Sequence, residues 1–530
     1  MSLPWLTLLI VVPLVGAVAA ALVPRLAPAS GDAAAQRSKQ IGLGASLLTL
    51  VLGVAVAAQY EVSGGMQLAE THSWIGALGV HYALGVDGLG LLLVLLTVVL
   101  VPIVLLASWH DVEEEPGATG QRTAGFVAWA LALEGLALAV FLATDVFLFY
   151  VVFEATLIPA YFLIGAYGRG DRGFAALKFL MYQLGGGLVL LGGVIGLYVV
   201  SAQAGTPSYL ISDLQRLDLG QDAERWLFVA FFVAFAVKAP LFPLHTWLAD
   251  TTERATPGTS VLLVCVLDKI GTFGMLRFCL GLFPEASQWA TPVVVTIALV
   301  SIVYGALLAI GQDDVLRLIG LTSLSHFGFI TLGIFAFSSQ GGSGSILYMV
   351  NHGIGTAALF LVAGYLIRRR GTTRISEMGG MEAATPVLAG MLLIAGLATL
   401  SLPGLSPFVS EMLVIIAAFD QHWWVGAVAV SGIVLAAIYV LWAYQRMMTG
   451  PPPEDAGSTG SARTLDLGAR ELAAIVPLVV LLIGLGLYPR PLFEASNPYV
   501  ADLMTHVGVQ DDAPAVTQPA AEPAAAPEEQ

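Results

Sequence analysis

Apolar runs long enough to cross a membrane recur along this chain from its first residues to about residue 490. The hydrocarbon core of a bilayer is about 30 Å thick, so a helix needs roughly 20 apolar residues to cross it. Only 11% of the residues are charged and 57% are hydrophobic, whereas about a quarter of the residues of a soluble domain are charged. The sequence therefore predicts an all-α polytopic membrane protein.

The apolar runs predict about fourteen transmembrane helices. They are expected at 3–23, 41–60, 84–109, 123–143, 146–168, 174–201, 226–248, 257–282, 289–310, 315–338, 345–370, 385–420, 424–448 and 470–490. The longest pieces expected outside the membrane are 61–83, 202–225 and 449–469. Residues 511–530 are almost all Ala, Pro, Glu, Gln and Asp, which cannot build a core, so we expect this tail to be disordered.

Lysine and arginine are distributed unevenly between alternate loops. One side of the expected topology holds sixteen of the twenty-two: Arg25, Arg37, Lys39, Arg122, Arg169, Arg172, Lys178, Arg254, Arg317, Arg368, Arg369, Arg370, Arg374, Arg446, Arg463 and Arg470. The other side holds four, which are Arg216, Arg225, Arg277 and Arg490. Because cytoplasmic loops carry the excess of positive charge, we expect both termini on the outer side of a bacterial plasma membrane.

Two stretches of equal length predict an internal repeat. Residues 123–282 and 289–448 each cover 160 residues and five expected helices, so the second unit enters the membrane inverted. The fourth helix of each unit is interrupted by prolines, namely Pro240, Pro243, Pro403 and Pro407. Broken helices at matching positions of inverted halves indicate an ion route. The remaining parts are three N-terminal helices (1–122), a loop with the last helix (449–510) and the tail (511–530).

The prolines also remove backbone donors, and their rings displace the carbonyls four residues back. We therefore expect free carbonyls in the two breaks, near Ala236, Ala239 and Thr399. Such groups are tolerated at membrane depth where they line a wet cavity or are buried in protein.

Four charged side chains lie well inside expected helices: Glu154, Lys238, Lys269 and Glu411. A lysine at a helix centre costs about 2.5–3.5 kcal/mol on insertion scales, and such residues mark ion pathways. Each of the two lysines lies about twelve residues into its helix, too deep for its head to reach water along the side chain. We interpret all four as proton carriers, with mutually paired structural charges as the alternative.

Three histidines also fall in apolar helices: His245, His326 and His352. Each could donate and accept along a chain of waters and lysines, so we interpret them as a proton relay, with satisfied core residues as the alternative. Their spacing suits no metal site. Glu134 is a further intramembrane acid, either a side branch or a paired structural residue. The glycine runs lack the strand–turn–helix context of a nucleotide site, so we expect no bound cofactor in this chain.

Five segments carry a family resemblance, and they occur in this order: FEATLIPAYFLIG, VKAPLFPLHTWLAD, LRLIGLTSLSHFGFI, NHGIGTAALFLVAG and LPGLSPFVSEM. In order and spacing they resemble the antiporter-like subunits of respiratory complex I, over roughly residues 84–448. The resemblance implies a fold of fourteen helices with two inverted repeats and one proton half-channel in each repeat.

The resemblance also assigns roles to individual residues. Glu154 resembles the family's helix-five glutamate and Lys238 its helix-seven lysine, while the three histidines match membrane histidines of the family. Lys269 resembles the connecting lysine of helix eight, and Glu411 resembles the exit residue of helix twelve. Two of the family's three antiporter-like subunits carry lysine at this last position. This chain carries glutamate there, so it is similar to the third subunit. Asp268 departs from the family, in which an apolar residue usually precedes the connecting lysine.

The resemblance implies proton translocation in the membrane arm of an NADH:quinone oxidoreductase. The sequence has no flavin, iron–sulfur or quinone signature, so these cofactors are expected in partner subunits. The expected partners are other membrane-arm subunits, including homologous antiporter-like subunits, and lipids, with no nucleic acid. Two alternatives stay open: a subunit of a multisubunit cation/proton antiporter of the Mrp type, and a purely structural membrane spacer.

Overall fold

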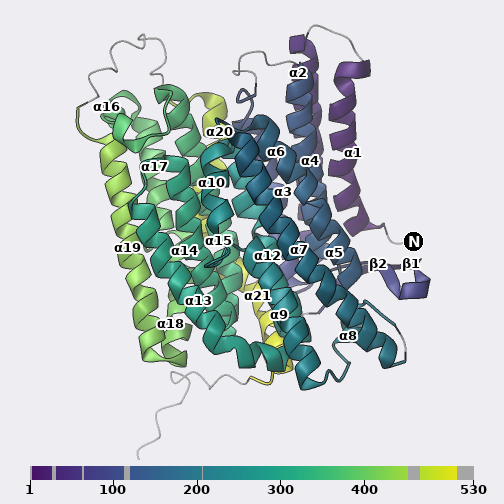
Figure 1. Cartoon of the computed structure of the whole chain (residues 1–530). Helices are drawn as coiled ribbons and strands as arrows, with labels where there is room; N and C mark the ends of the chain where they lie inside the picture. The colour runs from purple at the N-terminus through teal and green to yellow at the C-terminus, as the bar shows by residue number, and fades with distance from the viewer. Residues whose placement is uncertain are drawn as a thin grey trace, which may run out of the picture.

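The computed structural model describes residues 3–26, 31–62, 65–112, 120–205, 207–451 and 466–509. Most of these residues are helical, and the long helices pack side by side with their axes roughly aligned (Figure 1). Within the described ranges, twelve helical stretches are long and apolar enough to cross a membrane. The chain is therefore a multi-pass membrane protein. The expected tail 511–530 and Arg463 lie outside the described residues.

Most of the candidate spans are single helices. They are α1 (Trp5–Leu26), α2 (Gly31–Gln59), α3 (Gly88–Ala107), α4 (Gly120–Leu142), α7 (Arg172–Gln203), α13 (Pro284–Ile310), α14 (Val315–Ile334), α15 (Ser339–Arg370), α19 (Trp423–Met448) and α20 (Ala469–Leu487). The other candidates are composite. They consist of α5 (Val146–Ala155) with α6 (Leu157–Tyr167), and of α11 (Pro257–Val261), the π-helical η2 (Leu262–Leu267), α12 (Lys269–Gly274) and the π-helical η3 (Met275–Leu280).

Two expected spans are each divided into shorter helices. They are α9 (Gln221–Lys238) with α10 (Thr246–Arg254), and α17 (Pro386–Thr399) with α18 (Ser406–Gln421). Pro240 and Pro243 lie in the first gap, and Pro403 lies in the second. Pro407 stands in the first turn of α18, where proline fits because that amide has no helical partner. The predicted interruptions at the prolines are confirmed, while the inverted repeat stays a prediction.

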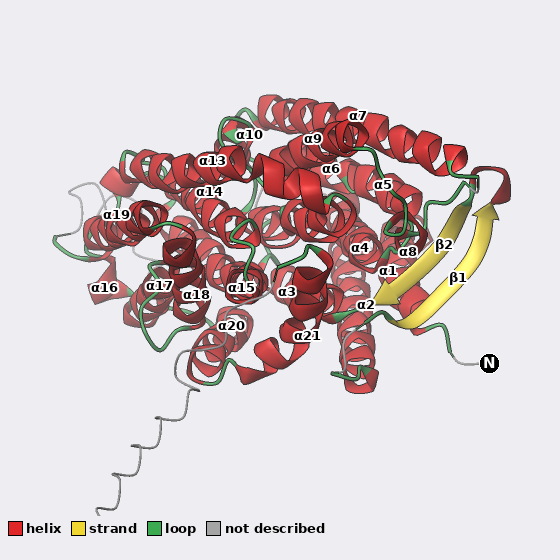
Figure 2. Ribbon diagram, turned by 90° about the horizontal axis from the view of Figure 1, so that it is seen from below, coloured by secondary structure: helices red, strands yellow, loops and turns green. Residues whose placement is uncertain are grey.

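Several short elements follow from no pattern used in the prediction. They are β1 (Gln67–Ile75), η1 (Gly76–Leu78), β2 (Val80–Val86), α8 (Ile211–Leu214), η4 (Ile375–Glu377), α16 (Met381–Ala384) and α21 (Arg490–His506). The strands form an antiparallel hairpin at the edge of the helix bundle (Figure 2). The carboxylate of Glu70 fastens this hairpin to the start of α1, where it accepts a hydrogen bond of 2.8 Å from the Leu6 amide. An anion is favoured there because helix N-termini carry unpaired amides.

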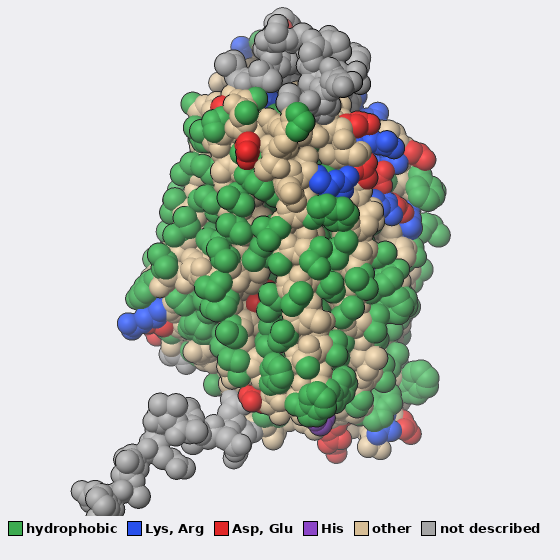
Figure 3. Space-filling view, turned by 90° about the vertical axis from the view of Figure 1, so that its left-hand side faces the viewer, with side chains coloured by type: hydrophobic (Ala, Val, Ile, Leu, Met, Phe, Trp, Pro, Cys, Tyr) green, Lys and Arg blue, Asp and Glu red, His purple; other side chains and the backbone are tan. Residues whose placement is uncertain are grey.

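The helices differ in how far the protein encloses them. The most apolar stretch of α15 is 100% buried, whereas that of α2 is only 28% buried. Exposed apolar side chains on the outer helices include Val15 at 60% and Val51 at 63% exposure. Hydrophobic side chains cover a broad belt on the face shown in Figure 3, and charged side chains gather mainly toward its two ends. This distribution fits a lipid-covered belt around a core that centres on α15.

One buried ion pair fastens the core near the end of a span. Arg277 was counted with the loop charges of one side although it falls near the end of the expected span 257–282, and the structure places it inside that span, in η3, where it is only 9% exposed. Its guanidinium donates two hydrogen bonds to the Asp87 carboxylate, at 2.5 and 2.8 Å. Asp87 also caps α3 by accepting from the Gly90 amide at 2.9 Å. The Tyr499 ring of α21 lies 5.2 Å from the guanidinium, so the pair joins α3, η3 and α21.

Replacing Arg277 with alanine is expected to destabilise the protein by roughly 3–5 kcal/mol, because it leaves the Asp87 carboxylate buried without its cation. The measurement is thermal unfolding of the purified protein in detergent. Arg490→Ala serves as the control, since Arg490 forms an exposed pair with Glu494 and should unfold like the wild type. Equal stability of Arg277→Ala and the wild type would contradict the assignment.

Candidate functional site

Lys238 is a fully buried lysine at the last residue of α9, immediately before the first break. Its Nζ donates to Thr156 Oγ1 at 3.4 Å and lies 4.7 Å from the centroid of the Phe153 ring. No carboxylate oxygen of the described residues lies within 4.0 Å of this Nζ. The ammonium is therefore held by a hydroxyl and an aromatic face rather than by an ion pair.

Glu154 lies in the last turn of α5, just before the chain passes into α6. Its carboxylate packs against Gly187 of α7, where any added Cβ would overlap the Oε1 atom. That oxygen is buried and has no hydrogen-bond partner among the described residues. Glu154 follows Phe153 and precedes Thr156 by two residues, and these are the two residues that the Lys238 ammonium contacts, but it forms no ion pair with that lysine within 4.0 Å.

Hydrogen bonds from the first break satisfy backbone carbonyls at the end of α9. The amide of Leu241 donates to the Ala236 carbonyl at 3.0 Å, and Trp247 Nε1 donates to the Val237 carbonyl at 3.1 Å. The expected free carbonyl at Ala236 is therefore wrong, because the turn after the helix reaches back five residues and satisfies it. These bonds hold the end of α9 rigid beside Lys238.

Lys269 begins α12, with a π-helical segment on each side. Its Nζ lies 2.6 Å from Nδ1 of His352 and 3.4 Å from the carbonyl of Val264. It also lies 4.3 Å from the centroid of the Phe327 ring. Isolated π-helical turns are rare and often occur at functional sites. Here they lie on either side of Lys269, whose Nζ contacts a histidine.

A chain of polar side chains continues from His352 into the second break. The His352 and His326 rings lie 5.1 Å apart between centroids, and Nδ1 of His326 is 2.7 Å from the Tyr348 hydroxyl. That hydroxyl donates to Oε2 of Glu411 at 3.0 Å, and Ser401 Oγ donates to the same oxygen. All of these residues are buried. They connect the centre of the protein with the gap between α17 and α18.

Four of the predicted site residues lie in one series of contacts, and the other predicted residues lie outside it. The structure brings Lys269, His352, His326 and Glu411 into one chain, which Tyr348 completes. The prediction missed Tyr348, although it lies four residues before a predicted histidine on the same helix and so shares its face. It also missed Thr156 and Ser401, because only the folded chain brings these hydroxyls to the charged groups.

His245 does not join the other two histidines. It lies in the first break, between α9 and α10, and its ring packs against Phe242 and Tyr304. Its Nδ1 is buried without a hydrogen-bond partner among the described residues. Glu134 of α4 is likewise buried, with both carboxylate oxygens unpartnered in the described part. Neither residue contacts the chain between Lys269 and Glu411 by a hydrogen bond that the described residues form.

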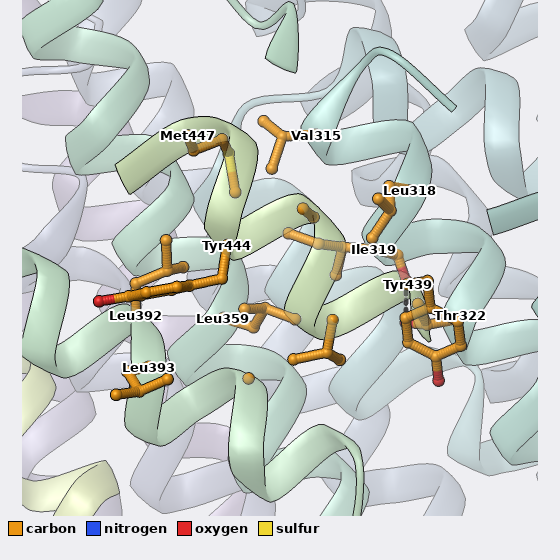
Figure 4. Close-up of a pocket in the computed structure, with 13 residues that line it drawn as sticks. Val315, Leu318, Ile319, Thr322, Leu359, Leu392, Leu393, Tyr439, Tyr444 and Met447 are labelled. Carbon is orange, nitrogen blue, oxygen red and sulfur yellow. Dashed lines mark hydrogen bonds between the residues drawn. The ribbon is translucent and has the colours of Figure 1, made fainter. Parts of the chain in front are cut away.

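An apolar cavity lies beside this chain, between α14, α15, α17 and α19 (Figure 4). Its volume is about 30 Å³, and its lining includes Ile319, Leu359, Leu392, Tyr439 and Val440. A buried water needs two to four polar partners. The almost wholly apolar lining does not supply them, so this cavity does not extend the polar chain.

An ion cluster joins three helices at the end of the bundle near the first break. Asp250 of α10 accepts from Lys178 Nζ of α7 and from Arg317 Nη1 of α14, each at 2.6 Å. Arg317 also donates to Glu253 at 2.7 Å. Burial raises the pKa of the Asp250 carboxyl, but the hydrogen bonds from Lys178 and Arg317 outweigh it, so the pKa lies below its ordinary 3.8. In the described ranges, no group of three or more His, Cys, Asp and Glu side chains could hold a metal ion.

Comparison with known proteins places this geometry in a family. Residues 143–436 match the family described as NADH:quinone oxidoreductase/Mrp antiporter, transmembrane. The chain is 46% identical to NADH-quinone oxidoreductase subunit M of Mycobacterium tuberculosis, covering 98% of this chain and 97% of that protein. It is 36% identical to NADH-quinone oxidoreductase subunit M of Rhodobacter capsulatus, covering 94% and 96% of the two chains.

Two solved structures share the fold. A chain of respiratory complex I from Thermus thermophilus with bound NADH superposes with a TM-score of 0.83 at 30% identity, over 95% of this chain and all of that one. A chain of the Mrp complex from Dietzia sp. DQ12-45-1b superposes with a TM-score of 0.81 over 96% of this chain and all of that one. The second pair is 23% identical, so that likeness shows the fold alone.

The ion cluster around Asp250 is expected to make stability depend on pH. A carboxyl whose pKa is lower in the folded state stabilises the protein above its unfolded pKa, and this contribution is lost as the pH falls through the folded pKa. The wild type should therefore be more stable than Asp250→Asn by a constant margin near neutral pH. The margin should shrink below the ordinary pKa of 3.8. Thermal unfolding in detergent at a series of pH values measures it, and a margin that persists unchanged into strong acid would refute the assignment.

Proposed function

We propose, because the chain belongs to the NADH:quinone oxidoreductase/Mrp antiporter transmembrane family, that it is a proton-translocating membrane subunit of NADH:quinone oxidoreductase. It would correspond to subunit M of its bacterial relatives. The observation that carries this proposal is the buried chain that runs from Lys269 through two histidines and Tyr348 to Glu411. A structural spacer has no use for such a chain in an apolar interior.

The proposed route has an entry, a centre and an exit. A proton first binds at Lys238, whose ammonium is stabilised when the Glu154 carboxylate approaches it. It then passes to Lys269, which lies in hydrogen-bond contact with His352. From there it moves through His326 and the Tyr348 hydroxyl to Glu411. Each member can both bind and release a proton, as a relay requires.

Energy magnitudes support the switching of Lys238 by Glu154. Moving one charge costs about 2.3 kcal/mol per 100 mV, so a proton-motive force of about 170 mV requires roughly 4 kcal/mol. Two unit charges 4 Å apart interact by about 4 kcal/mol at an effective dielectric constant near 20. The change in interaction energy when Glu154 approaches or withdraws is therefore large enough to bind a proton to Lys238 and to release it again. The separated arrangement, with no ion pair within 4.0 Å, supports the unloading state.

The remaining parts of the proposal concern the assembly. Electron transfer is assigned to partner subunits, which carry the flavin, the iron–sulfur clusters and the quinone. The partners in the membrane are homologous antiporter-like subunits and lipids. Both termini face the outer side of the bacterial plasma membrane, as the distribution of lysine and arginine supports. The five-helix units 123–282 and 289–448 each contribute one broken helix to the route.

The alternative is a subunit of a multisubunit cation/proton antiporter, which the shared fold of the Mrp chain allows. The relatives that match at 46% and 36% identity are both named as oxidoreductase subunits. Co-purification distinguishes the two functions. An affinity-tagged chain isolated in mild detergent should bring subunits with flavin and iron–sulfur absorbance, whereas an antiporter complex would bring none.

Lys238→Ala and Glu154→Ala are each expected to abolish proton pumping by the assembled complex, because they remove the switchable charge or the group that switches it. Lys238→Arg should also be impaired, since arginine keeps its charge and does not release the proton. The measurement is NADH-driven acidification of inverted membrane vesicles, with complex content checked by native gel. Normal pumping by well-assembled Lys238→Ala vesicles would sink the proposal.

Tyr348→Phe is expected to slow pumping by about 10²-fold, the effect typical of a lost proton-transfer group. The substitution keeps the ring and deletes the hydroxyl between His326 and Glu411. Tyr439→Phe is the matched control, because Tyr439 is also buried but lines the apolar cavity. Glu411→Gln should resemble Tyr348→Phe, while Glu411→Asp should retain activity. If Tyr348→Phe and Tyr439→Phe pump equally fast, the chain through Tyr348 is not the route.

A further inference from the structure

A buried carboxylate that the proposed route leaves unused lies next to Lys269. Asp268 is 1% exposed and stands at the junction of η2 and α12. Both of its carboxylate oxygens are buried and have no hydrogen-bond partner among the described residues. An uncompensated buried charge costs several kcal/mol. The acid must therefore be balanced by nearby cations or hold a proton itself.

Asp268 lies on the face of its helix that is directed toward α9. Gly271 lies three residues further on, and a Cβ added there would collide with the backbone of Phe235 and Ala239. Residues three apart on a helix share a face, so Asp268 lies on the side that meets α9. That contact falls at the end of α9, where Lys238 is the last residue.

The charges around Asp268 agree with this placement. Lys269 follows Asp268 directly in the chain, and Lys238 ends α9, whose last turn packs against Gly271. The charged groups that act on Asp268 itself are Lys269 and Lys238. No carboxylate oxygen lies within 4.0 Å of either ammonium in the described part of the chain. Asp268 thus lies next to Lys269 in the chain and on the helix face that meets the end of α9, with no ion pair to either lysine within 4.0 Å.

A carboxylate near both lysines provides the proton acceptor that two ammonium groups lack. An ammonium has only donors, so a charged Lys238 cannot accept anything from Lys269 or share a hydrogen bond with it when both are protonated. Like charges at close range also repel. A carboxylate accepts protons from either side and reduces the repulsion while both lysines are charged.

We propose that Asp268 carries the proton between Lys238 and Lys269, an inference that rests on the proposed function and adds a residue to it. In the first step an N–H bond of the Lys238 ammonium breaks and an O–H bond forms on the Asp268 carboxylate, directly or through one water. Lys238 becomes a neutral amine and Asp268 a neutral acid. In the second step that O–H bond breaks and an N–H bond forms on the neutral Lys269 amine, which restores the carboxylate. Protons and charge balance in both steps.

The test compares Asp268→Asn with Asp268→Glu in the whole assembled complex. Asparagine keeps the size and polarity but cannot accept a proton, so pumping per NADH oxidised should fall by about 10²-fold. Glutamate keeps the titratable group and should retain most of the pumping. Cys279→Ala is the matched control, because Cys279 is buried in the same span and should pump like the wild type. Wild-type pumping by Asp268→Asn overturns the proposal, and so does equal loss in Asp268→Asn and Asp268→Glu.

A second measurement separates a proton carrier from a fixed counter-ion and does not depend on the assembly of Asp268→Asn. Infrared difference spectra of the wild-type complex, recorded on addition of NADH, should contain a protonated-carboxyl band that shifts in Asp268→Glu. A fixed counter-ion gives no such band, and its absence would refute the proposal. The two proposals fail separately. Normal pumping by Lys238→Ala refutes the proposed function, whereas loss in Lys238→Ala with normal pumping in Asp268→Asn refutes only the role of Asp268.

Discussion

Two lysines, Lys238 and Lys269, are fully buried inside the helix bundle, and in the described part of the chain neither has an ion-pair partner within 4.0 Å. A charged side chain there costs several kcal/mol unless something compensates it. Lys238 has a hydroxyl and the Phe153 ring, and Lys269 has a histidine and the Phe327 ring. A desolvated cation over an aromatic face gains about 2 kcal/mol, which leaves each ammonium only partly compensated. The proposed function requires this incomplete compensation, because an ammonium that its surroundings stabilise only in part can release its proton.

The buried Arg277 illustrates the opposite arrangement. It is always charged, and its two hydrogen bonds to Asp87 lock it in place between three helices. The protein therefore contains two kinds of buried cation. The fully paired arginine joins helices, whereas Lys238 and Lys269 have no ion-pair partner within 4.0 Å among the described residues, as their proposed role requires. The difference lies in the partner set and not in the depth of burial, since Arg277 and both lysines are each buried.

The apolar runs, the proline breaks and the buried charges could all be predicted from the sequence, because each is a local property. Mean composition over twenty residues indicates a span, and Pro240 or Pro403 marks a break wherever it stands in an apolar run. The π-helical segments beside Lys269 have no such signature, since Leu262–Leu267 is as apolar as any α-helical run. Ser401 and Thr156 could not be predicted as partners, because only the tertiary fold brings them to Glu411 and Lys238. The pairing of Arg277 with Asp87 could not be predicted for the same reason, since the two residues lie 190 positions apart in the chain.

The series of polar side chains is interrupted by gaps, and these gaps bear on the proposed function. The His352 and His326 rings approach to 5.1 Å between centroids, yet the Nε2 atoms of both have no hydrogen-bond partner among the described residues. A second gap separates Lys238 from Lys269, which no hydrogen bond among the described residues joins. An uninterrupted chain of hydrogen bonds across the membrane would let protons run back down the gradient and would dissipate about 4 kcal/mol per proton at about 170 mV. The proposed pumping function requires segments that each conduct protons and that are never all joined at once. Short hydrogen bonds within each segment, and unpartnered polar atoms between segments, are the arrangement that this requirement predicts.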